Sequence, residues 1–261
     1  MNKPIGIFDS GVGGLTVVES LKKQLPHEDI IYIGDNLHCP YGDKTKEQLL
    51  SYTKQICRYF ISQNVKMIVL ACNTTSANVL SELQNLFSEV PIVGVIHSTV
   101  HDFLIQEKKN VLIIATHATI QSHKYKEMIE EYNKDIHVTE IETPQLVPLI
   151  ESGEYKNGIH DVLKGYLLEY KEQIDSLILG CTHYPIVLNQ IKDILGDKAY
   201  ISSSDAISQE VNSYLKVHKM LNDNTNQAMI RIYTTGDVHD FVFSSEDFFN
   251  YDDLEVNHLD L

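Results

Sequence analysis

The feature that most constrains the fold is a regular alternation of short apolar runs with helical stretches. Such alternation is typical of mostly parallel sheets that helices cover on both faces. In the first part of the chain the strand-like runs are IGIF (5–8), IIYIG (30–34), MIVL (67–70) and PIVGVI (91–96). Helices are expected between them, from the periodicity of their apolar residues, over roughly 15–23, 45–62 and 76–86.

The same pattern then restarts at a nearly constant offset. VLIIAT (111–116) stands where IGIFDS (5–10) stood, and HVTEIE (137–142) follows it as IIYIGD (30–35) does in the first part. A helix is expected over roughly 158–171, and SLILGCTHY (176–184) repeats MIVLACNTT (67–75). We interpret this recurrence as two related halves.

The segment after Asp205 has no counterpart in the first half. It reads as a helix to about Leu221, a polar linker over Asn222–Gln227, a strand IRIYTT (230–235) and a last helix near Phe248. We expect it to pack back on the first half. The predicted domains are therefore 1–97 plus about 206–261, and about 98–205.

Charge and cysteine usage exclude several classes of protein. The 261 residues carry a net charge of −15, which repels phosphate backbones and anionic lipid, so neither nucleic acid nor membrane is an expected partner. No run is long and apolar enough to span a bilayer, and the N-terminus does not resemble a signal peptide. We therefore expect a cytoplasmic protein whose four cysteines, at 39, 57, 72 and 181, are reduced.

Two of these cysteines carry the functional prediction. Cys72 and Cys181 follow strands at equivalent places in the two halves, where α/β proteins bind ligands. Each precedes residues typical of helix starts, and a helix N-terminus is expected to lower a thiol pKa. Two opposed thiols suit inversion at a carbon, since one removes a proton from one face and the other protonates the opposite face.

Each candidate also has a plain structural interpretation. A cysteine at a strand end is more often a core residue, and recurrence is what distinguishes this pair; Cys57 is interpreted as core, and Cys39 in HCPYG (38–42) stays open. Asp9 is either a turn cap or a carboxylate that exchanges protons with a thiol. The glycines of GVGG (11–14) lack the spacing of a phosphate loop, and are expected to let backbone N–H groups approach a substrate carboxylate.

Four segments in order resemble the signature segments of glutamate racemases: FDSGVGG (8–14), PYG (40–42), ACNTTSAN (71–78) and GCTHYP (180–185). The resemblance extends from about Gly6 to Asp237. It implies two pseudo-twofold-related α/β domains, with the active site in the cleft between them and with no cofactor, neither pyridoxal phosphate nor metal. It also implies racemisation of L- and D-glutamate, with D-glutamate used for peptidoglycan synthesis, and a homodimer is the expected assembly.

The resemblance further implies residue roles. Cys72 would act on D-glutamate with help from Asp9, and Cys181 on L-glutamate with help from His183 and Glu151. Taken alone, His183 fits a turn or capping residue and Glu151 a helix-end residue. The positions that match the substrate pocket are Asp9, Ser10, Pro40, Tyr41, Gly42, Cys72, Asn73, Thr74, Thr116, Thr119, Cys181, Thr182 and His183.

The chain departs from the family pattern at four places. His97-Ser98 stands where Glu-Pro is usual, and Ala115-Thr116 where Gly-Thr is usual. Thr143 replaces a common cysteine, and a serine run near Ile201-Ser202 replaces an Asp-Ser pair. None of these positions carries a predicted proton-transfer role.

Four alternatives stay open at this point. The chain could be another racemase of the superfamily, acting on aspartate or a hydantoin, or a one-thiol member. It could be a cysteine hydrolase that pairs Cys72 with His183. It could be a two-lobed amino-acid binder without catalysis, or it could hold zinc with Cys72, Cys181 and His183, although their spacing lacks paired ligands.

Overall fold

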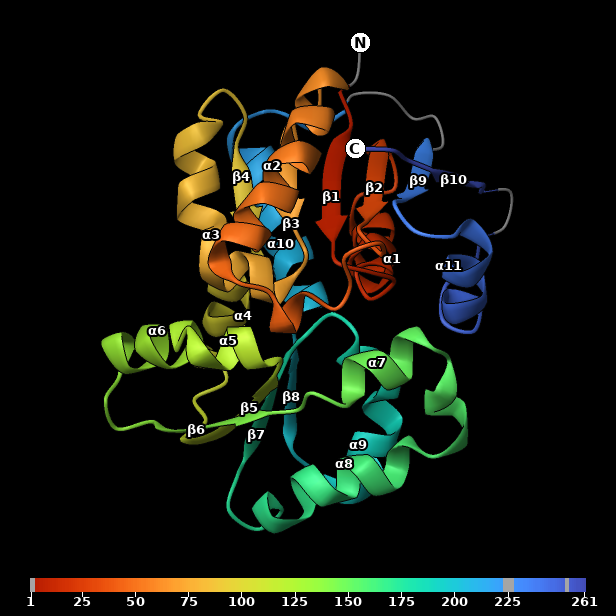
Figure 1. The fold of residues 1–261 in the computed structure, drawn as a ribbon. Coiled ribbons are helices and arrows are strands. Elements are labelled where there is room, and N and C mark those ends of the chain that lie inside the picture. Colours follow the sequence, from red (N-terminus) through yellow and green to blue (C-terminus); the bar gives the residue numbers. More distant parts are fainter. Residues whose placement is uncertain (1–2, 223–227, 252–253) are drawn as a thin grey trace.

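Two parallel sheets organise the chain in the computed structural model, which describes residues 3–222, 228–251 and 254–261. One sheet has six strands in the order β10-β9-β2-β1-β3-β4, and the other has four in the order β6-β5-β7-β8. The sheets lie in the upper and lower parts of Figure 1. Most of the linker expected over Asn222–Gln227 lies outside the described residues.

The strands are short and, at the centre of each sheet, fully buried. Their bounds are β1 Ile5–Asp9, β2 Ile30–Gly34, β3 Met67–Leu70, β4 Ile92–Gly94, β5 Asn110–Ala115, β6 His137–Glu142, β7 Ser176–Gly180, β8 Ala199–Ser202, β9 Ile230–Thr234 and β10 Val256–His258.

Helices connect the strands and cover the sheets. The α-helices are α1 Leu15–Gln24, α2 Lys46–Ser62, α3 Asn73–Leu86, α4 Val95–Leu104, α5 His117–Gln121, α6 Lys124–Tyr132, α7 Leu146–Glu151, α8 Ile159–Leu167, α9 Leu188–Leu195, α10 Ser203–Val217 and α11 Val238–Ser245. Four 3₁₀ turns complete the described elements: η1 Tyr41–Asp43, η2 Glu154–Asn157, η3 Leu168–Tyr170 and η4 Tyr184–Val187.

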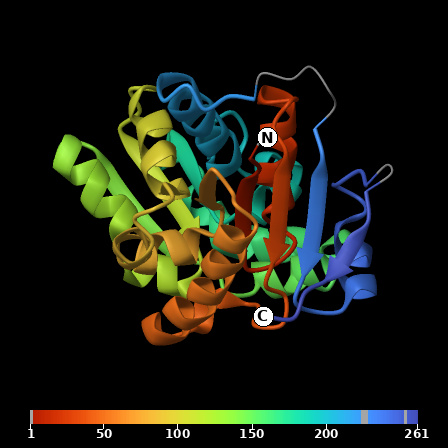
Figure 2. The ribbon, with the colours of Figure 1, turned by 90° about the horizontal axis from the view of Figure 1, so that it is seen from above.

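The predicted repeat is confirmed by the strand order. The run β2-β1-β3-β4 in the first sheet matches β6-β5-β7-β8 in the second, strand for strand. The tail adds β9 and β10 to the first sheet, where β9 pairs in parallel with β2 from Ile30↔Ile230 to Gly34↔Thr234. Figure 2 shows this blue tail strand beside the red N-terminal strands, as the sequence predicts.

Alternating side chains place each sheet between two apolar layers. Ile5 and Ile7 face a central layer that contains α1, α4, α6 and α10, and the same layer receives Ile113 from the second sheet. The outer face of the first sheet packs on α2 and α3. The outer face of the second sheet packs on α7, α8 and α9. Burial on both faces explains why the strands read as continuous apolar runs.

Two sequence expectations need correction. The strand expected to run to Ile96 ends at Gly94, and Val95 and Ile96 begin α4, where the Val95 N–H reaches the Ser76 hydroxyl at 3.3 Å. The last helix, α11, ends at Ser245, before Phe248. These segments are apolar in either conformation, so their periodicity does not separate strand from helix.

Helices α4 and α10 pack against each other and carry the chain between the two sheets. The expected boundaries at 97/98 and 205/206 fall inside these helices. The exact domain division stays a prediction.

Candidate active site

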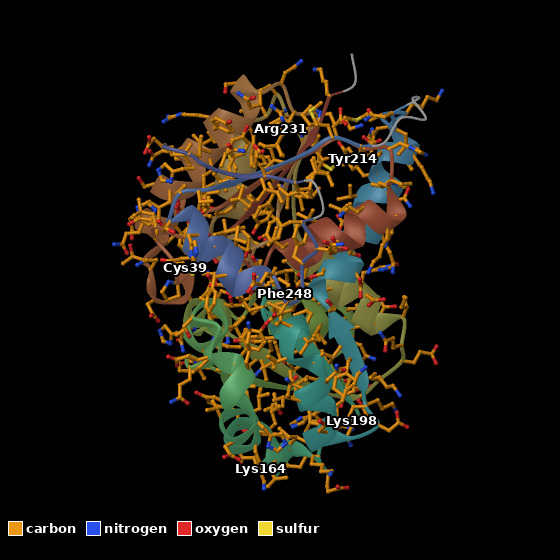
Figure 3. The ribbon with its side chains drawn as sticks, turned by 90° about the vertical axis from the view of Figure 1, so that its right-hand side faces the viewer. Cys39, Lys164, Lys198, Tyr214, Arg231 and Phe248 are labelled. Carbon is orange, nitrogen blue, oxygen red and sulfur yellow. The ribbon has the colours of Figure 1, made fainter. Side chains whose placement is uncertain are left out.

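A narrow cavity of about 10 Å³ lies where the loops of the two sheets meet. Its wall contains residues from both halves, and all but one of them belong to the substrate pocket predicted from the sequence. They are Ser10, Pro40, Tyr41, Gly42, Cys72, Asn73, Thr74, Thr116, Val147, Cys181, Thr182 and His183. Figure 3 shows Cys39, the neighbour of this wall, at the level where the two halves meet.

The two thiols reach this cavity from opposite sheets. Cys72 follows β3 and occupies the N-cap position of α3, with extended backbone angles. Cys181 directly follows β7, and the 3₁₀ turn η4 begins three residues later. Both side chains are almost completely buried, at 4% and 7% exposure. The recurrence seen in the sequence therefore brings both cysteines to one enclosed space.

The protonation of Cys72 differs from the sequence expectation. A helix N-terminus was expected to lower its pKa, but burial raises it to about 12, and the Asp9 carboxylate adds to the rise. The hydroxyl and backbone N–H of Thr75 act in the opposite direction and do not compensate. Full desolvation of a thiolate outweighs a few donors, so Cys72 is a neutral thiol near neutral pH.

Asp9 lies at the end of β1, completely buried behind the cavity wall. Its Oδ2 accepts hydrogen bonds from the backbone N–H groups of Gly14 at 2.9 Å and Gly11 at 3.4 Å, and Thr182 donates to both carboxylate oxygens at 3.2 Å. Burial raises the pKa of Asp9 to about 6, although the charge of His183 and the two backbone donors oppose the rise. A carboxyl group with this pKa can exchange protons near neutral pH.

His183 links Cys181 to Glu151. Its Nδ1 lies 3.4 Å from Sγ of Cys181, and its Nε2 lies 2.5 Å from Oε1 of Glu151. Burial lowers the pKa of His183, but Cys181 and Glu151 together outweigh burial and raise it well above its ordinary value. The hydrolase alternative paired His183 with Cys72, whereas the structure pairs it with Cys181.

Glu151 joins the two halves. It ends α7 in the second half, yet its Oε1 accepts from the backbone N–H of Val12 at 2.9 Å and its Oε2 accepts from Asn36 Nδ2 at 3.0 Å. The hydroxyl of Ser244, in the tail helix α11, donates to its backbone carbonyl at 2.6 Å. Residues of the first half therefore hold the Glu151 carboxylate in place, and this carboxylate in turn positions His183.

The GVGG loop serves a different purpose from the one expected. Its N–H groups were expected to face a substrate carboxylate, but those of Gly11, Val12 and Gly14 donate to the carboxylates of Asp9 and Glu151. A Cβ on Gly11 would lie 2.0 Å from Oε1 of Glu151, and one on Gly13 would lie 2.5 Å from Nδ1 of His183. Glycine is needed here because protein side chains, rather than a ligand, approach the backbone.

Small polar side chains complete the wall. The hydroxyls of Thr74, Thr116 and Thr119 form a triangle with edges of 2.8, 3.0 and 3.3 Å. Thr119 and Asp9 are the predicted pocket residues that lie behind the lining rather than in it. Uncharged hydroxyls suit a ligand that carries both signs of charge.

Sequence reasoning missed two residues near the cavity. Val147, on α7, lines it, and Tyr125 of α6 donates to Oδ1 of Asn73 at 2.5 Å. Ser203 holds the other end of the same amide, accepting from Asn73 Nδ2 at 3.4 Å. An apolar position in LVPLIE (146–151) and a tyrosine in a polar helix carry no signal of this kind in the sequence.

The two halves differ where helper groups are needed. The strand β5 ends at Ala115 where the equivalent β1 ends at Asp9, so the second half has no carboxylate at that position. His183 and Glu151 stand beside Cys181 instead. A duplicated fold thus holds two thiols in chemically different surroundings.

In the ranges 3–222, 228–251 and 254–261, no group of three or more His, Cys, Asp or Glu side chains is placed to hold a metal ion. No helix among these residues is long and apolar enough to cross a membrane.

Comparisons with known proteins agree over nearly the whole chain. A family model for Asp/Glu/Hydantoin racemase matches residues 6–211. The glutamate racemase of Lysinibacillus sphaericus is 37% identical over 265 residues and covers 100% of both chains. That of Bacillus cereus is 39% identical over 263 residues, covering 99% of this chain and 97% of its own.

Solved structures give the same result. A glutamate racemase isoform from Bacillus anthracis superposes with a TM-score of 0.92 at 37% identity, covering 99% of this chain and 98% of its own. The enzyme from Francisella tularensis, solved in complex with D-glutamate, gives 0.89 at 38% identity, with coverages of 100% and 97%. An aspartate racemase from Picrophilus torridus, at 17% identity and a TM-score of 0.62, shares the fold alone.

The raised pKa of Asp9 predicts a stability that depends on pH. In the unfolded chain this carboxyl titrates near its ordinary 3.8, so between about pH 4 and pH 6 the folded state retains a proton that the unfolded state releases. Ionisation of Asp9 therefore lowers the free energy of unfolding, and this effect is complete above about pH 6. The effect decreases as the pH falls from about 6 to about 4. Asp9→Asn should raise the free energy of unfolding by about 1–3 kcal/mol at about pH 8, with a smaller gain towards pH 5.

Urea unfolding at several pH values measures this effect. Asp161→Asn, which alters a fully exposed carboxylate, is the matched control and should change nothing. A gain for Asp9→Asn that is the same at every pH would contradict the assignment.

Proposed function

This chain belongs to the Asp/Glu/Hydantoin racemase family, and from that premise we propose that it interconverts L- and D-glutamate by a two-base mechanism. The observation that supports the mechanism is that Cys72 and Cys181 reach one buried cavity from two related sheets, each with its own helper group. Full-length similarity to glutamate racemases at 36–39% identity supports the substrate.

For L-glutamate, Cys181 removes the α-proton and Cys72 donates one to the opposite face. The raised pKa of His183 keeps its imidazole protonated, and this positive charge next to Sγ stabilises a thiolate on Cys181. The electron pair left on Cα delocalises into the substrate carboxylate. Cys72, whose thiol stays protonated, then delivers its proton to Cα and becomes a thiolate.

For D-glutamate the roles reverse. Cys72 must first lose its proton, and Asp9, with a pKa of about 6, is the group that accepts it. The Cys72 thiolate then removes the α-proton. Cys181, once it has taken the proton of the His183 imidazolium, protonates the other face and returns to the thiolate. In the L direction the thiols end with exchanged protonation states, and in the D direction Asp9 ends protonated and His183 neutral; proton transfer with solvent restores the starting state.

Polar groups around the cavity suit the rest of the substrate. The N-terminal backbone N–H groups of α3 beside Cys72 suit a carboxylate. The side chains of Ser10, Asn73 and Thr182, with the hydroxyls of Thr74 and Thr116, suit the second carboxylate and the ammonium group. We further propose that the reaction needs no cofactor and that D-glutamate is used in peptidoglycan synthesis. Each chain would consist of two domains, 1–97 plus about 206–261 and about 98–205, and two chains would form a homodimer in the cytoplasm.

Chiral chromatography tests the substrate directly. The protein, dialysed against a chelator and given no added cofactor, should convert either pure enantiomer of glutamate into the racemate. Its kcat/KM should be higher for glutamate than for aspartate, because discrimination is a ratio of these constants. A higher value for aspartate would reject the substrate, and activity that returns only with pyridoxal phosphate or a metal would reject cofactor independence.

Deuterium labelling tests the two-base mechanism. In D₂O, the D-glutamate formed early from L-glutamate should be fully deuterated at Cα, because Cys72 has exchanged with solvent. The remaining L-glutamate should stay protiated, since Cys181 removes its proton without returning deuterium to the same face. A single base would place protium in the product or deuterium in the recovered substrate. Cys72→Ser and Cys181→Ser should each abolish racemisation, whereas Cys57→Ser, which alters a buried core cysteine that does not line the cavity, should keep it.

The helper assignment predicts asymmetric kinetics. Asp9→Asn should lower kcat most for D-glutamate, and His183→Asn most for L-glutamate, by about 10²–10⁴-fold. Because enantiomers have equal free energy in water, kcat/KM must match in the two directions for every variant, so the asymmetry appears in kcat and in the primary isotope effects. His160→Asn, which changes a half-exposed histidine, is the control. Equal isotope effects in both directions for both variants would mean that the assignment is wrong.

A further inference from the structure

One buried carboxylate has no part in the mechanism above. Asp35 directly follows β2 and is 2% exposed. Its oxygens accept from three side chains: the hydroxyl of Tyr41, the hydroxyl of Thr235 at 2.6 Å, and Nδ1 of His38, which lies 2.9 Å from each oxygen. Two of these donors come from the loop after β2 and the third from the residue that follows the tail strand β9, so one carboxylate joins two distant segments.

Tyr41 connects this carboxylate to the cavity. Its ring packs between Phe8, at 5.8 Å, and Tyr52, at 6.0 Å between centroids, and it is 2% exposed. Burial and the Asp35 charge raise the pKa of Tyr41 well above its ordinary value, so its hydroxyl keeps the proton and donates. Pro40, Tyr41 and Gly42 form one wall of the cavity.

The same wall contacts the second half. A Cβ on Gly42 would lie 2.8 Å from Cβ of Thr116, so the turn η1 rests directly on the start of α5. The backbone N–H of Asp35 also donates to the carbonyl of Asp9 at 3.0 Å. A shift of Tyr41 would therefore open the cavity at its boundary between the halves.

We propose that Asp35 is a positioning residue, whose buried carboxylate fixes Tyr41 and so holds the Pro40–Gly42 wall closed over the bound amino acid. The inference rests on the proposed function for the identity of that amino acid. The proposal also assigns a function to the tail strand β9, which places Thr235 where its hydroxyl can donate to Asp35. Asp35 touches neither thiol in this arrangement and acts only through Tyr41.

The second half contains a related arrangement at the equivalent position. Thr143 follows β6 as Asp35 follows β2, and its N–H donates to Ala115 as that of Asp35 does to Asp9. Its hydroxyl lies 2.5 Å from that of Tyr184, next to the Cys181 loop. In both halves, the residue after the second strand hydrogen-bonds to a buried tyrosine. In the first half that residue is the carboxylate of Asp35, and in the second half it is the hydroxyl of Thr143.

Steady-state kinetics in both directions tests the proposal. Asp35→Ala should raise KM for both enantiomers by roughly tenfold, the scale of one hydrogen bond to a charged group, with kcat and the isotope effects little changed. Asp35→Asn keeps an acceptor oxygen for Tyr41 and should show a smaller rise. This pattern differs from that of the helper variants, because a wall that holds substrate affects the two directions equally.

Glu28→Gln is the matched control. Glu28 is a carboxylate with the same 2% exposure near the opposite end of β2, where it pairs with Lys66 and accepts from the N–H of Asn222 at 2.7 Å. Its loss destabilises the same sheet without touching the cavity wall, so KM should not change. A rise in KM for Glu28→Gln equal to that for Asp35→Ala would assign the effect to general destabilisation and overturn the proposal.

A double-mutant cycle tests the route through Tyr41. If Asp35 acts through that hydroxyl, Asp35→Ala should add little to KM in a Tyr41→Phe background, whereas independent effects would multiply. Additive free energies would overturn the proposal. Should Asp35→Ala fail to fold, Thr235→Val removes one donor at nearly constant shape, and an unchanged KM in both Thr235→Val and Asp35→Asn would overturn it equally.

A second readout needs no racemase substrate. Loosening the wall should speed alkylation of Cys72 by iodoacetamide, followed by mass spectrometry, by about tenfold in Asp35→Ala and not in Glu28→Gln, because Cys72 is almost fully buried. If the wild-type protein fails to racemise glutamate while Asp35→Ala still speeds alkylation of Cys72, the proposed function is rejected and this inference is kept. Normal racemisation with unchanged alkylation and KM in Asp35→Ala would reject the inference alone.

Discussion

Desolvation of ionisable groups between the two sheets is the constraint on which the rest of the site depends. Asp9, Cys72 and His183 lie in a space that the apolar layers of both halves exclude from water, and there each pKa is set by its few neighbours. Burial alone would keep Asp9 and Cys72 protonated, so neither could accept a proton. The N–H groups of the GVGG loop and the charge of His183 bring the pKa of Asp9 back to about 6, where it can exchange a proton.

Duplication explains the two thiols but not their helpers. Equivalent strands place Cys72 and Cys181 alike, whereas Asp9 corresponds to Ala115, and His183 and Glu151 serve the second thiol instead. The first half fixes Glu151 through Val12 and Asn36, so the surroundings of Cys181 depend on residues from both sheets. The asymmetry suits opposed roles, because in the resting protein one thiol is protonated by burial while the other lies beside an imidazolium.

Much of this architecture could be predicted from the sequence, because strand runs and their repetition are local patterns. The position of Asp9 at the end of the first strand, and of Cys72 and Cys181 shortly after strands, follows from such patterns. For the tail the sequence predicts packing on the first half, but not the pairing of β9 with β2. What could not be predicted depends on three-dimensional neighbours. Desolvation of Cys72 reverses the expected effect of its helix, the GVGG amides bind protein carboxylates, and Asp35 acquires its donors only once Thr235 is beside it.

The contacts that set the protonation states are also those that hold the halves together. Thr182 reaches Asp9 across the cleft, and Glu151 reaches Val12 and Asn36. Most residues of the cavity wall are buried, so these pairs lie in a desolvated space. Water admitted to Asp9 would weaken the desolvation that raises its pKa. The pKa of Asp9 therefore depends on the contacts that hold the two halves against each other.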